Sequence, residues 1–445
     1  MSVFIKEISF KGIKNLKDKT IIQFSKKDIK KFSEVSGNNI KAIYGPNGSG
    51  KTAIVHGFDI LKSLVVINNY LQDSDHTMRL YELLNKANKD KQIDLSISFL
   101  HADDNQPIKN YNYHITLTCV NQSFEITYEK FSVKDNEYAT EKVIFEVVDA
   151  VIKQYNLKYE KTVFTNLLNK RTLPNILLSI YSNFDNNEDD NKKIWLKDIE
   201  TIDALYSLIF DTKVILDDKN EHQTVVSPSS HLNFTAEQFI DMRNQNIKDI
   251  KLGVSTKVVK EYQLKMIKSE KTNKEKFLKV FKPSIKRIEI KEQLKVKHKI
   301  KGSDLYTINE FIDYGDFKLD TEFESIGIKK LLSLYDAIKH LQGGGIAVID
   351  ELDSHINDIY LIKLIEYISE FTKGQLIFTT HNVSPMDILK SKKYSIDFMA
   401  MNGKVTSWTQ VGNYSPSKLY QKGMISGLPF NLKKEDFLSV FDNES

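Results

Sequence analysis

One short segment near the N-terminus combines glycine turns with a lysine and a threonine. The pattern of a phosphate-binding loop is matched by eight consecutive residues, Gly45, Pro46, Asn47, Gly48, Ser49, Gly50, Lys51 and Thr52. Glycines let the backbone turn sharply, so that successive N–H groups face an anion. Lys51 can reach the β- and γ-phosphates of a nucleotide, and Thr52 can offer its hydroxyl to Mg²⁺. The loop, together with Ala53 in the helix that follows, therefore predicts binding of ATP.

Two acids follow an apolar run late in the chain. The residues of 345–349 are apolar, and Asp350 and Glu351 come directly after them. A buried parallel strand would deliver both carboxylates to the same sheet edge as the phosphate loop. Asp350 is then expected to hold Mg²⁺, and Glu351 to orient and deprotonate the attacking water. The alternative, a solvated acidic turn after a buried strand, is less compatible with the phosphate loop.

Two more segments carry polar groups to element ends. Glu324, Ser325 and Gly327 stand at the start of an amphipathic pattern. The Ser325 hydroxyl and nearby N–H groups could bind a γ-phosphate, or Ser325 could simply cap the helix. The β-rich run 375–379 brings His381 to a strand end, where an imidazole can donate to a γ-phosphate. A lone histidine at such a position is commonly structural, so its order after the other motifs is what favours a catalytic role.

The elements that must position these residues follow from hydrophobic spacing. Strands are expected at 3–10, 20–24, 41–44, 94–100, 113–120, 124–128, 346–349 and 375–379. Helices are expected at 53–67, 328–341 and 360–370, and residues 140–300 have a mostly helical pattern. The fold class is therefore α/β. We divide the chain into an N-terminal lobe (1–135) with the phosphate loop and an antiparallel β subdomain, a mostly helical insertion (136–304), and a C-terminal lobe (305–445).

Composition restricts the class of protein. The chain has 445 residues, a net charge of +4 and one cysteine, Cys119, which can form neither an internal disulfide nor a cysteine metal cluster. No apolar run is long enough for a transmembrane helix, so a cytoplasmic protein without membrane contact is expected. Residues 183–192 form an acidic, asparagine-rich loop. Residues 251–301 carry 17 Lys or Arg against 5 Glu, which indicates either a solvated helical face or a surface that follows nucleic-acid phosphates.

The order of these motifs resembles the ABC-type (P-loop NTPase) ATPase head of transporters, DNA-repair and chromosome-maintenance ATPases, and OLD-like phage-defence ATPases. The opening segment 8–16 resembles that of repair-type heads, which makes Lys11 a candidate nucleotide contact. The segment 324–334 resembles the E-S-x-G-x-K/R-x-L-x-x-L signature of OLD-like and abortive-infection ATPases rather than the LSGGQ of transporters. The segment 414–430 also resembles the ends of stand-alone members of that group.

The resemblance implies two heads that face each other. Lys51, Thr52, Asp350, Glu351 and His381 of one copy would hold ATP and Mg²⁺, while Ser325 and Gly327 of the other copy would cap the γ-phosphate. A homodimer or a higher homo-oligomer is therefore expected. The family's Q-loop glutamine could be Gln92 or Gln122, and Asn357 stands where related heads often carry Asp or His.

The resemblance also bears on the output of the ATPase. OLD nucleases continue into a Toprim domain, whereas this sequence ends, as in the ATPase subunits of two-gene phage-defence systems such as PARIS and Septu. A separate effector, a nuclease or toxin, is therefore expected. The competing interpretation is a DNA-repair or DNA-maintenance ATPase of the RecF or SMC type, which would bind nucleic acid through Lys251–Lys301. A transporter subunit is disfavoured by the signature and by the long insertion.

Overall fold

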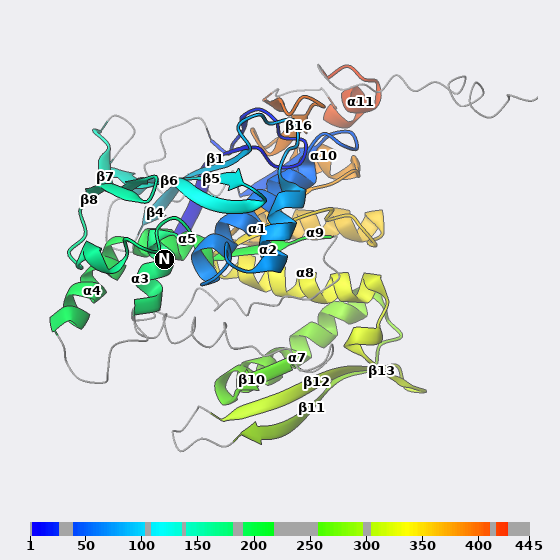
Figure 1. The fold of residues 1–445 in the computed structure, drawn as a ribbon. Helices are drawn as coiled ribbons and strands as arrows, with labels where there is room; N and C mark the ends of the chain where they lie inside the picture. The colour runs from blue at the N-terminus through cyan, green and yellow to red at the C-terminus, as the bar shows by residue number, and fades with distance from the viewer. Residues whose placement is uncertain are drawn as a thin grey trace, which may run out of the picture.

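The computed structural model describes residues 2–25, 39–102, 108–135, 139–180, 190–217, 257–296, 304–409 and 415–425. Figure 1 shows two sheets in the main body and a third, smaller one below helix α8. Three segments named above fall partly outside the described residues: residues 183–189 of the acidic loop, both ends of the basic stretch, and residues 414 and 426–430 of the segment 414–430.

The first sheet is antiparallel, in the order β2-β1-β4-β5-β6-β7-β8. Its strands are β1 (Ser2–Lys11), β2 (Thr20–Gln23), β4 (Gln92–Ala102), β5 (Lys109–Val120), β6 (Ser123–Lys134), β7 (Lys142–Val148) and β8 (Val151–Tyr155). The strands that alternation predicts in this region are confirmed, and the sheet continues through β7 and β8. This sheet is the antiparallel β subdomain that the sequence predicts.

The second sheet carries the sequence motifs at its edge. Its order is β17-β16-β3-β15-β14-β9, and all neighbouring pairs are parallel except β16 with β17. The strands are β3 (Ile40–Tyr44), β9 (Thr212–Ile215), β14 (Ile346–Ile349), β15 (Gln375–Thr379), β16 (Ile396–Met399) and β17 (Val405–Ser407). Strand β15 lies between β3 and β14, so the phosphate loop and the two acids are separated by the strand that leads to His381.

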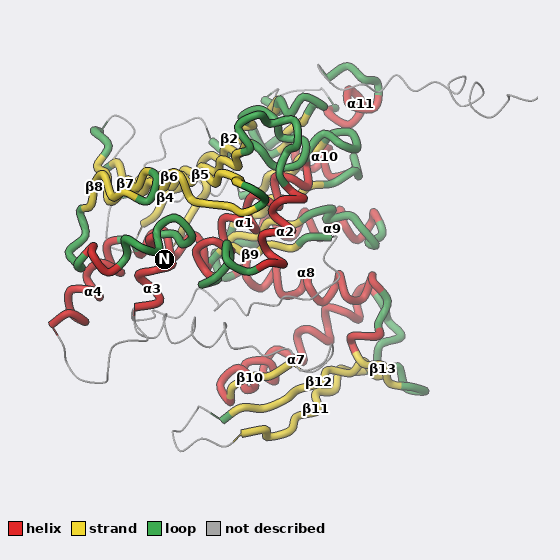
Figure 2. The backbone as a smooth tube through the Cα atoms, in the orientation of Figure 1, coloured by secondary structure: helices red, strands yellow, loops and turns green. Residues whose placement is uncertain are grey.

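Helices cover both faces of this parallel sheet (Figures 1 and 2). The helices toward the antiparallel sheet include α1 (Lys51–Val66), α3 (Leu173–Ile180) and α5 (Asp203–Phe210), with α2 (Ser74–Leu83) and α4 (Asp190–Thr201) further out. On the opposite face are α8 (Ile326–Gln342), α9 (Asp358–Phe371), α10 (Ser384–Leu389) and α11 (Pro416–Gln421). The parallel sheet is therefore covered on both faces, as its fully buried strands β3, β14, β15 and β16 require.

The third sheet belongs to a small unit beside α8. Strand β12 (Leu305–Asp313) pairs with β11 (Arg287–Val296) on one side and with β10 (Lys257–Lys260) and β13 (Lys318–Asp320) on the other. Helix α7 (Glu261–Phe281) joins the unit to α8 through the ring contact of Phe277 with Tyr335, whose centroids are 5.6 Å apart. Two short 3-10 helices, Lys161–Val163 and Thr321–Phe323, complete the described elements.

The segment 136–304 differs from the mostly helical structure that its pattern predicts. Besides α3, α4, α5 and α7 it contains the strands β7, β8, β9, β10 and β11. Strand β9 is only four residues long, which is too short for a clear period in the sequence. In β11 the apolar alternation of Ile288 and Ile290 is obscured by the surrounding lysines. The division at 135/136 and 304/305 stays a prediction.

Candidate functional site

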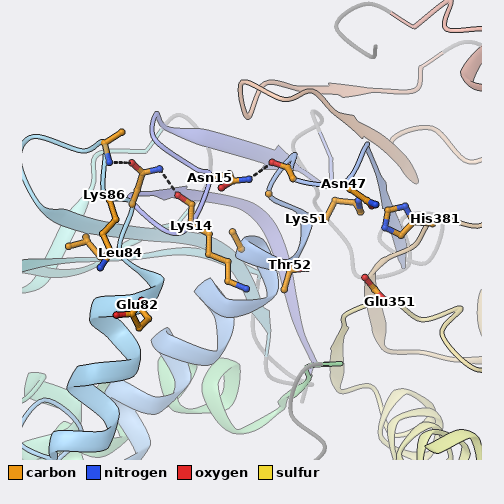
Figure 3. Close-up of a pocket in the computed structure, with 15 residues that line it drawn as sticks. Lys14, Asn15, Asn47, Lys51, Thr52, Glu82, Leu84, Lys86, Glu351 and His381 are labelled. Carbon is orange, nitrogen blue, oxygen red and sulfur yellow. Dashed lines mark hydrogen bonds between the residues drawn. The ribbon is translucent and has the colours of Figure 1, made fainter. Parts of the chain in front are cut away.

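The predicted motif residues meet at a cavity of about 660 Å³. Figure 3 shows its side chains. The lining residues are Lys14, Asn15, Asn47, Gly48, Gly50, Lys51, Thr52, Ala53, Glu82, Leu84, Asn85, Lys86, Ala87, Glu351 and His381. Lys51, Thr52, Glu351 and His381 lie toward one end, and Glu82, Leu84 and Lys86 toward the other (Figure 3).

The phosphate loop has the backbone that its glycines allow. Gly50 has φ +104°, a left-handed conformation that a side chain would strain, and it caps the N-terminus of α1. The Lys51 ammonium donates to the carbonyl oxygens of Gly45 at 2.8 Å and Pro46 at 3.2 Å, so it lies folded against its own loop. The Ser49 hydroxyl is buried and has no hydrogen-bond partner among the described residues. The loop thus presents a helix N-terminus and polar groups suited to an anion.

The charge of Lys51 depends on its neighbours. Burial lowers the pKa of this ammonium from its ordinary value, and the carboxylates of Glu351 and Asp350 oppose that shift. A phosphate group would add further negative charge beside Lys51. The lysine is therefore placed where an anionic ligand stabilises its charged form.

A hydroxyl and a carboxylate lie together as a metal site would need. Thr52 Oγ1 is 3.3 Å from Asp350 Oδ1, which also accepts a 2.6 Å hydrogen bond from the Thr379 hydroxyl. Asp350 is only 2% exposed. These oxygen ligands fit Mg²⁺, which usually keeps several waters and binds one or two carboxylates and substrate phosphates. No group of three or more His, Cys, Asp or Glu side chains suited to a metal occurs among the described residues, so waters and phosphate would have to complete the shell.

Glu351 follows β14 in an unusual backbone conformation. Its φ is +43°, in the left-handed region, although it is not glycine. Its N–H donates to the Thr379 hydroxyl at 2.8 Å, the same hydroxyl that donates to Asp350. The turn directs the Glu351 side chain to the cavity, at the same end as His381 (Figure 3). A residue held in this region at a site of chemistry is a candidate functional group.

His381 reaches the cavity from the end of β15. Burial, and next the positive charge of Lys51, lower the pKa of its imidazole from the ordinary value. The neutral form is therefore favoured at neutral pH, and this form still has one N–H to donate. Neighbouring Asn382 holds the turn, since its amide donates to the Asp358 carboxylate at 2.7 Å.

The signature residues lie apart from this lining. The exposed Ser325 caps α8, because its hydroxyl accepts the Ile328 N–H at 3.4 Å. Gly327 lies beside His355, where a Cβ would be 3.5 Å from the His355 carbonyl oxygen. Neither signature residue is among those that line the cavity within this chain. Locally, therefore, Ser325 acts as a helix cap, and its predicted γ-phosphate contact would need a second copy.

Residues of the N-terminal lobe line the cavity where the sequence did not predict it. Lys11, the candidate from the opening motif, is not among the lining residues, and its ammonium lies 3.7 Å from Asp90. Lys14 and Asn15 line the cavity instead, and the Asn15 amide donates to the Gly48 carbonyl oxygen of the phosphate loop. Glu82, Leu84, Asn85, Lys86 and Ala87, from the end of α2 and the connection to β4, also line it. A polar turn gives no sequence signal for such a role.

The remaining single-residue predictions have local structural roles. Gln92 donates to the Thr118 hydroxyl at 3.3 Å within the antiparallel sheet, and Gln122 lies in the turn between β5 and β6. Neither glutamine lines the cavity. Asn357 caps α9 by accepting the Ile359 N–H at 3.0 Å, which explains why an asparagine suits that position.

Solved structures of SMC head domains are similar to this chain. A head domain bound to the C-winged helix domain of ScpA is 15% identical, with a TM-score of 0.44, 93% of this chain and 99% of that chain covered. A head domain with a coiled coil and joint from Pyrococcus yayanosii is 13% identical, with a TM-score of 0.43 over 95% of this chain and 100% of that chain. Comparison with curated proteins gives no match.

The wider class is established by a family model that covers most of the chain. The model, described as "AAA domain, putative AbiEii toxin, Type IV TA system", matches residues 40–387. The match begins at the strand before the phosphate loop and extends past His381. In the described residues, no helix has the length and apolar character needed to span a membrane. With its P-loop α/β architecture, the chain belongs to this family of AAA domains.

Proposed function

We propose that the chain binds ATP with Mg²⁺ in this cavity and hydrolyses it to ADP and phosphate. The observation that supports this most is the convergence of Lys51, Thr52, Glu351 and His381 at one end of the cavity. The buried Asp350 is not among the lining residues, but its carboxylate lies 3.3 Å from the Thr52 hydroxyl at that end. These are the group types that phosphoryl transfer to water needs: a cation, a metal site, a base and a donor. They follow three neighbouring strands, β3, β15 and β14, at one edge of the parallel sheet.

Each residue then has a role in the proposed reaction. Lys51 and the phosphate-loop N–H groups bind the β- and γ-phosphates. Thr52 and Asp350 would hold Mg²⁺, which neutralises charge that develops on the phosphate oxygens. Glu351 accepts a proton from the attacking water, and His381 donates a hydrogen bond to the γ-phosphate. The nucleoside would extend toward Lys14, Leu84 and Lys86 at the other end of the cavity.

Replacing the proposed base tests this function. In Glu351→Gln, turnover of Mg-ATP should fall by about 10²-fold or more, because an amide cannot accept the proton. Nucleotide affinity should stay close to that of the wild type, since the phosphate loop is intact. Glu366→Gln on α9 is the matched control, since Glu366 pairs with Lys363 on the surface. Wild-type turnover in Glu351→Gln would remove Glu351 from the reaction.

We further propose that two copies complete the site. Ser325 and Gly327 lie outside the cavity of their own chain, at the exposed start of α8. Helix N-termini bind anions, so the start of α8 in a second copy is suited to the γ-phosphate of the first. Hydrolysis would remove the group that joins the two surfaces. ATP would therefore shift the equilibrium between an open and a closed arrangement of the two copies, because it binds only one of these arrangements well.

The proposed biological role is the ATPase or sensor component of a bacterial anti-phage system, acting with a separate effector. The Glu324–Leu334 signature and the family description, which refers to a toxin–antitoxin system, support this role. Purifying the tagged chain from its own host with and without phage infection tests it. A nuclease or toxin subunit that co-purifies stoichiometrically is expected, and its absence in both conditions would contradict the role.

The alternative is a DNA-maintenance ATPase that uses the basic stretch. Its described part forms β10, α7 and β11. Many cations of α7 and β11 already have acidic partners: Lys265 with Glu261, Lys268 with Glu292, Lys274 with Glu310, Lys279 with Glu275, and Arg287 with Glu289 and Asp313. This pairing favours a solvated face. Lys286, Lys291 and Lys295 are exposed and remain the best candidates for phosphate contacts. Salt-sensitive DNA binding that is lost in Lys286→Glu with Lys291→Glu would favour the alternative.

A further inference from the structure

A buried lysine of the signature helix contacts the backbone of both catalytic-site acids. Lys330 comes five residues after Ser325 on α8 and is 7% exposed. Its ammonium donates to the carbonyl oxygens of Asp350 at 3.2 Å and Glu351 at 3.0 Å. The same ammonium also donates to the Asp217 carboxylate at 3.0 Å. One side chain therefore joins α8, the end of β14 and the end of β9.

Lys330 holds a strained part of the backbone, the turn at Glu351. Glu351 has φ +43°, a conformation that costs free energy for a residue with a Cβ. Its N–H is fixed by Thr379 at 2.8 Å and its carbonyl oxygen by Lys330 at 3.0 Å. These contacts act on both sides of the Glu351 Cα, so they set the direction in which its carboxylate leaves the backbone. The Glu351 carbonyl oxygen also accepts the Ser354 N–H at 2.9 Å, within the turn itself. Without Lys330, the turn would keep this bond and the contact from β15, but it would lose its link to α8.

Asp217 is the counter-charge that keeps Lys330 in place. Its carboxylate also accepts the Ser354 hydroxyl at 2.7 Å, in the loop after Glu351. Burial alone would raise the pKa of Asp217, but the hydrogen bond from Ser354 and the charge of Lys330 lower it overall. Asp217 therefore stays ionised at neutral pH. A buried ammonium with this partner and two carbonyl acceptors is fully engaged.

The same loop touches the signature residues directly. Gly327 lies against His355, which follows Ser354 and has φ +61°. The start of α8 thus contacts the segment from Asp350 to His355 at two places, with Gly327 beside His355 and Lys330 bonded to the carbonyl oxygens of Asp350 and Glu351. A shift of the first turn of α8 would be transmitted to the backbone of Glu351.

We propose that Lys330 is a positioning residue that fixes the orientation of Glu351 and links it to the start of the signature helix. This inference rests on the proposed ATPase function. Its consequence is a route by which a group bound at Ser325 sets the geometry of the base in the same chain. Lys330 touches no substrate atom in this account, and it acts only through the backbone of Asp350 and Glu351.

Steady-state kinetics of Lys330→Met test the inference. We expect kcat to fall by about 100-fold, the loss that a misplacement of roughly 1 Å causes. The dissociation constant of a fluorescent ATP analogue should change less than threefold, since the phosphate loop is untouched. Lys363→Met, at an exposed lysine of α9 with a side chain 73% exposed, is the matched control and should keep wild-type kcat. Lys330→Arg, which keeps the charge and the donors, should recover part of kcat.

Further outcomes separate this inference from the ATPase proposal. A folded Lys330→Met with wild-type kcat would overturn the inference alone, provided that Glu351→Gln is inactive. Equal losses of nucleotide affinity, kcat and melting temperature would also overturn it, because they indicate a purely structural role. If Lys330→Met does not fold, the variant Asp217→Asn tests the inference in its place. A reduced kcat with unchanged nucleotide affinity in Asp217→Asn supports the inference, and an unchanged kcat overturns it. Absence of turnover in the wild type would remove the ATPase function and the inference together.

Discussion

At the scale of single residues, one oxygen of Asp350 connects two neighbouring strand ends with helix α1. It accepts a hydrogen bond from Thr379 at 2.6 Å and lies 3.3 Å from the Thr52 hydroxyl. Because Thr379 also accepts the Glu351 N–H, the proposed metal ligand and the proposed base share a single hydroxyl. This shared partner restricts the Asp350 carboxylate and the Glu351 backbone to one relative position, which supports an oriented metal site.

The Thr52 hydroxyl is expected to determine the Mg²⁺ requirement. In Thr52→Ala, the Mg²⁺ concentration for half-maximal ATP turnover should rise about tenfold, because one oxygen ligand is lost. Thr52→Ser keeps the hydroxyl and should behave like the wild type. Titration of turnover with MgCl₂ at saturating ATP measures the effect. An unchanged Mg²⁺ dependence in the alanine variant would show that Thr52 does not contact the metal.

At the scale of elements, α8 joins the signature to the parallel sheet at both of its ends. Lys330 contacts the sheet near the N-terminus of the helix. Near the C-terminus, His340 donates from Nε2 to the Asp211 carbonyl oxygen at 2.6 Å, next to strand β9. Burial lowers the pKa of His340 from 6.5 to about 4, so this imidazole is neutral in the folded protein at neutral pH.

The buried His340 predicts a pH dependence of stability. Between pH 6.5 and about 4 the unfolded chain binds a proton that the folded chain does not, so stability is lost as the pH falls through this range. His340→Gln keeps an N–H donor for Asp211 but does not titrate. The free energy of unfolding of wild type minus that of His340→Gln should therefore decrease by about 3 kcal/mol from pH 7 to pH 4. Urea denaturation across this range measures it, and parallel curves would contradict the prediction.

Helices and strands next to clear motifs could be predicted from the sequence, and their partners could not. The run 346–349 is all apolar, the run 375–379 has an apolar centre, and both precede catalytic-type residues, so their strands and the parallel sheet were predictable. Nothing in the sequence indicates that β15 would lie between β3 and β14. Asp217, the partner of Lys330, follows the short strand β9 and is 113 residues earlier in the chain. Such long-range contacts depend on tertiary packing that local patterns do not encode.

The residues at the proposed nucleoside end of the cavity could not be predicted from the sequence, for a related reason. Glu82, Leu84 and Lys86 lie where α2 ends and a polar turn begins, and such turns are common in any protein. Only the fold brings this turn to the phosphate loop. Lys11 is the predicted nucleotide contact in the N-terminal segment, but the residues of this segment that line the cavity are Lys14 and Asn15, a few positions later. These two residues follow the turn at Gly12, which directs the chain to the cavity.

At the scale of the whole molecule, the ATPase head is formed by segments from both ends of the chain. Strands β3 and β16 flank one another in the same sheet although they are separated by more than 350 residues. Buried Lys41 and Asp397, both 0% exposed, form an ion pair of 2.9 Å between these two strands. The cavity residues are thus fixed on a buried sheet, while Ser325 and Gly327 are not among the residues that line the cavity. The arrangement suits a site that a second copy completes.

Complementation between two inactive variants tests this claim most directly. Ser325→Arg keeps its own cavity but blocks the surface offered to a partner, and Lys51→Ala does the reverse. Each alone should be inactive, and an equimolar mixture should recover about a quarter of wild-type ATP turnover, because half of the dimers are mixed and each has one intact site. A mixture of Lys51→Ala with Glu351→Gln is the control and should recover nothing, since both defects lie in the same half-site. Wild-type turnover by Ser325→Arg alone, or no recovery in the first mixture, would contradict the two-copy site.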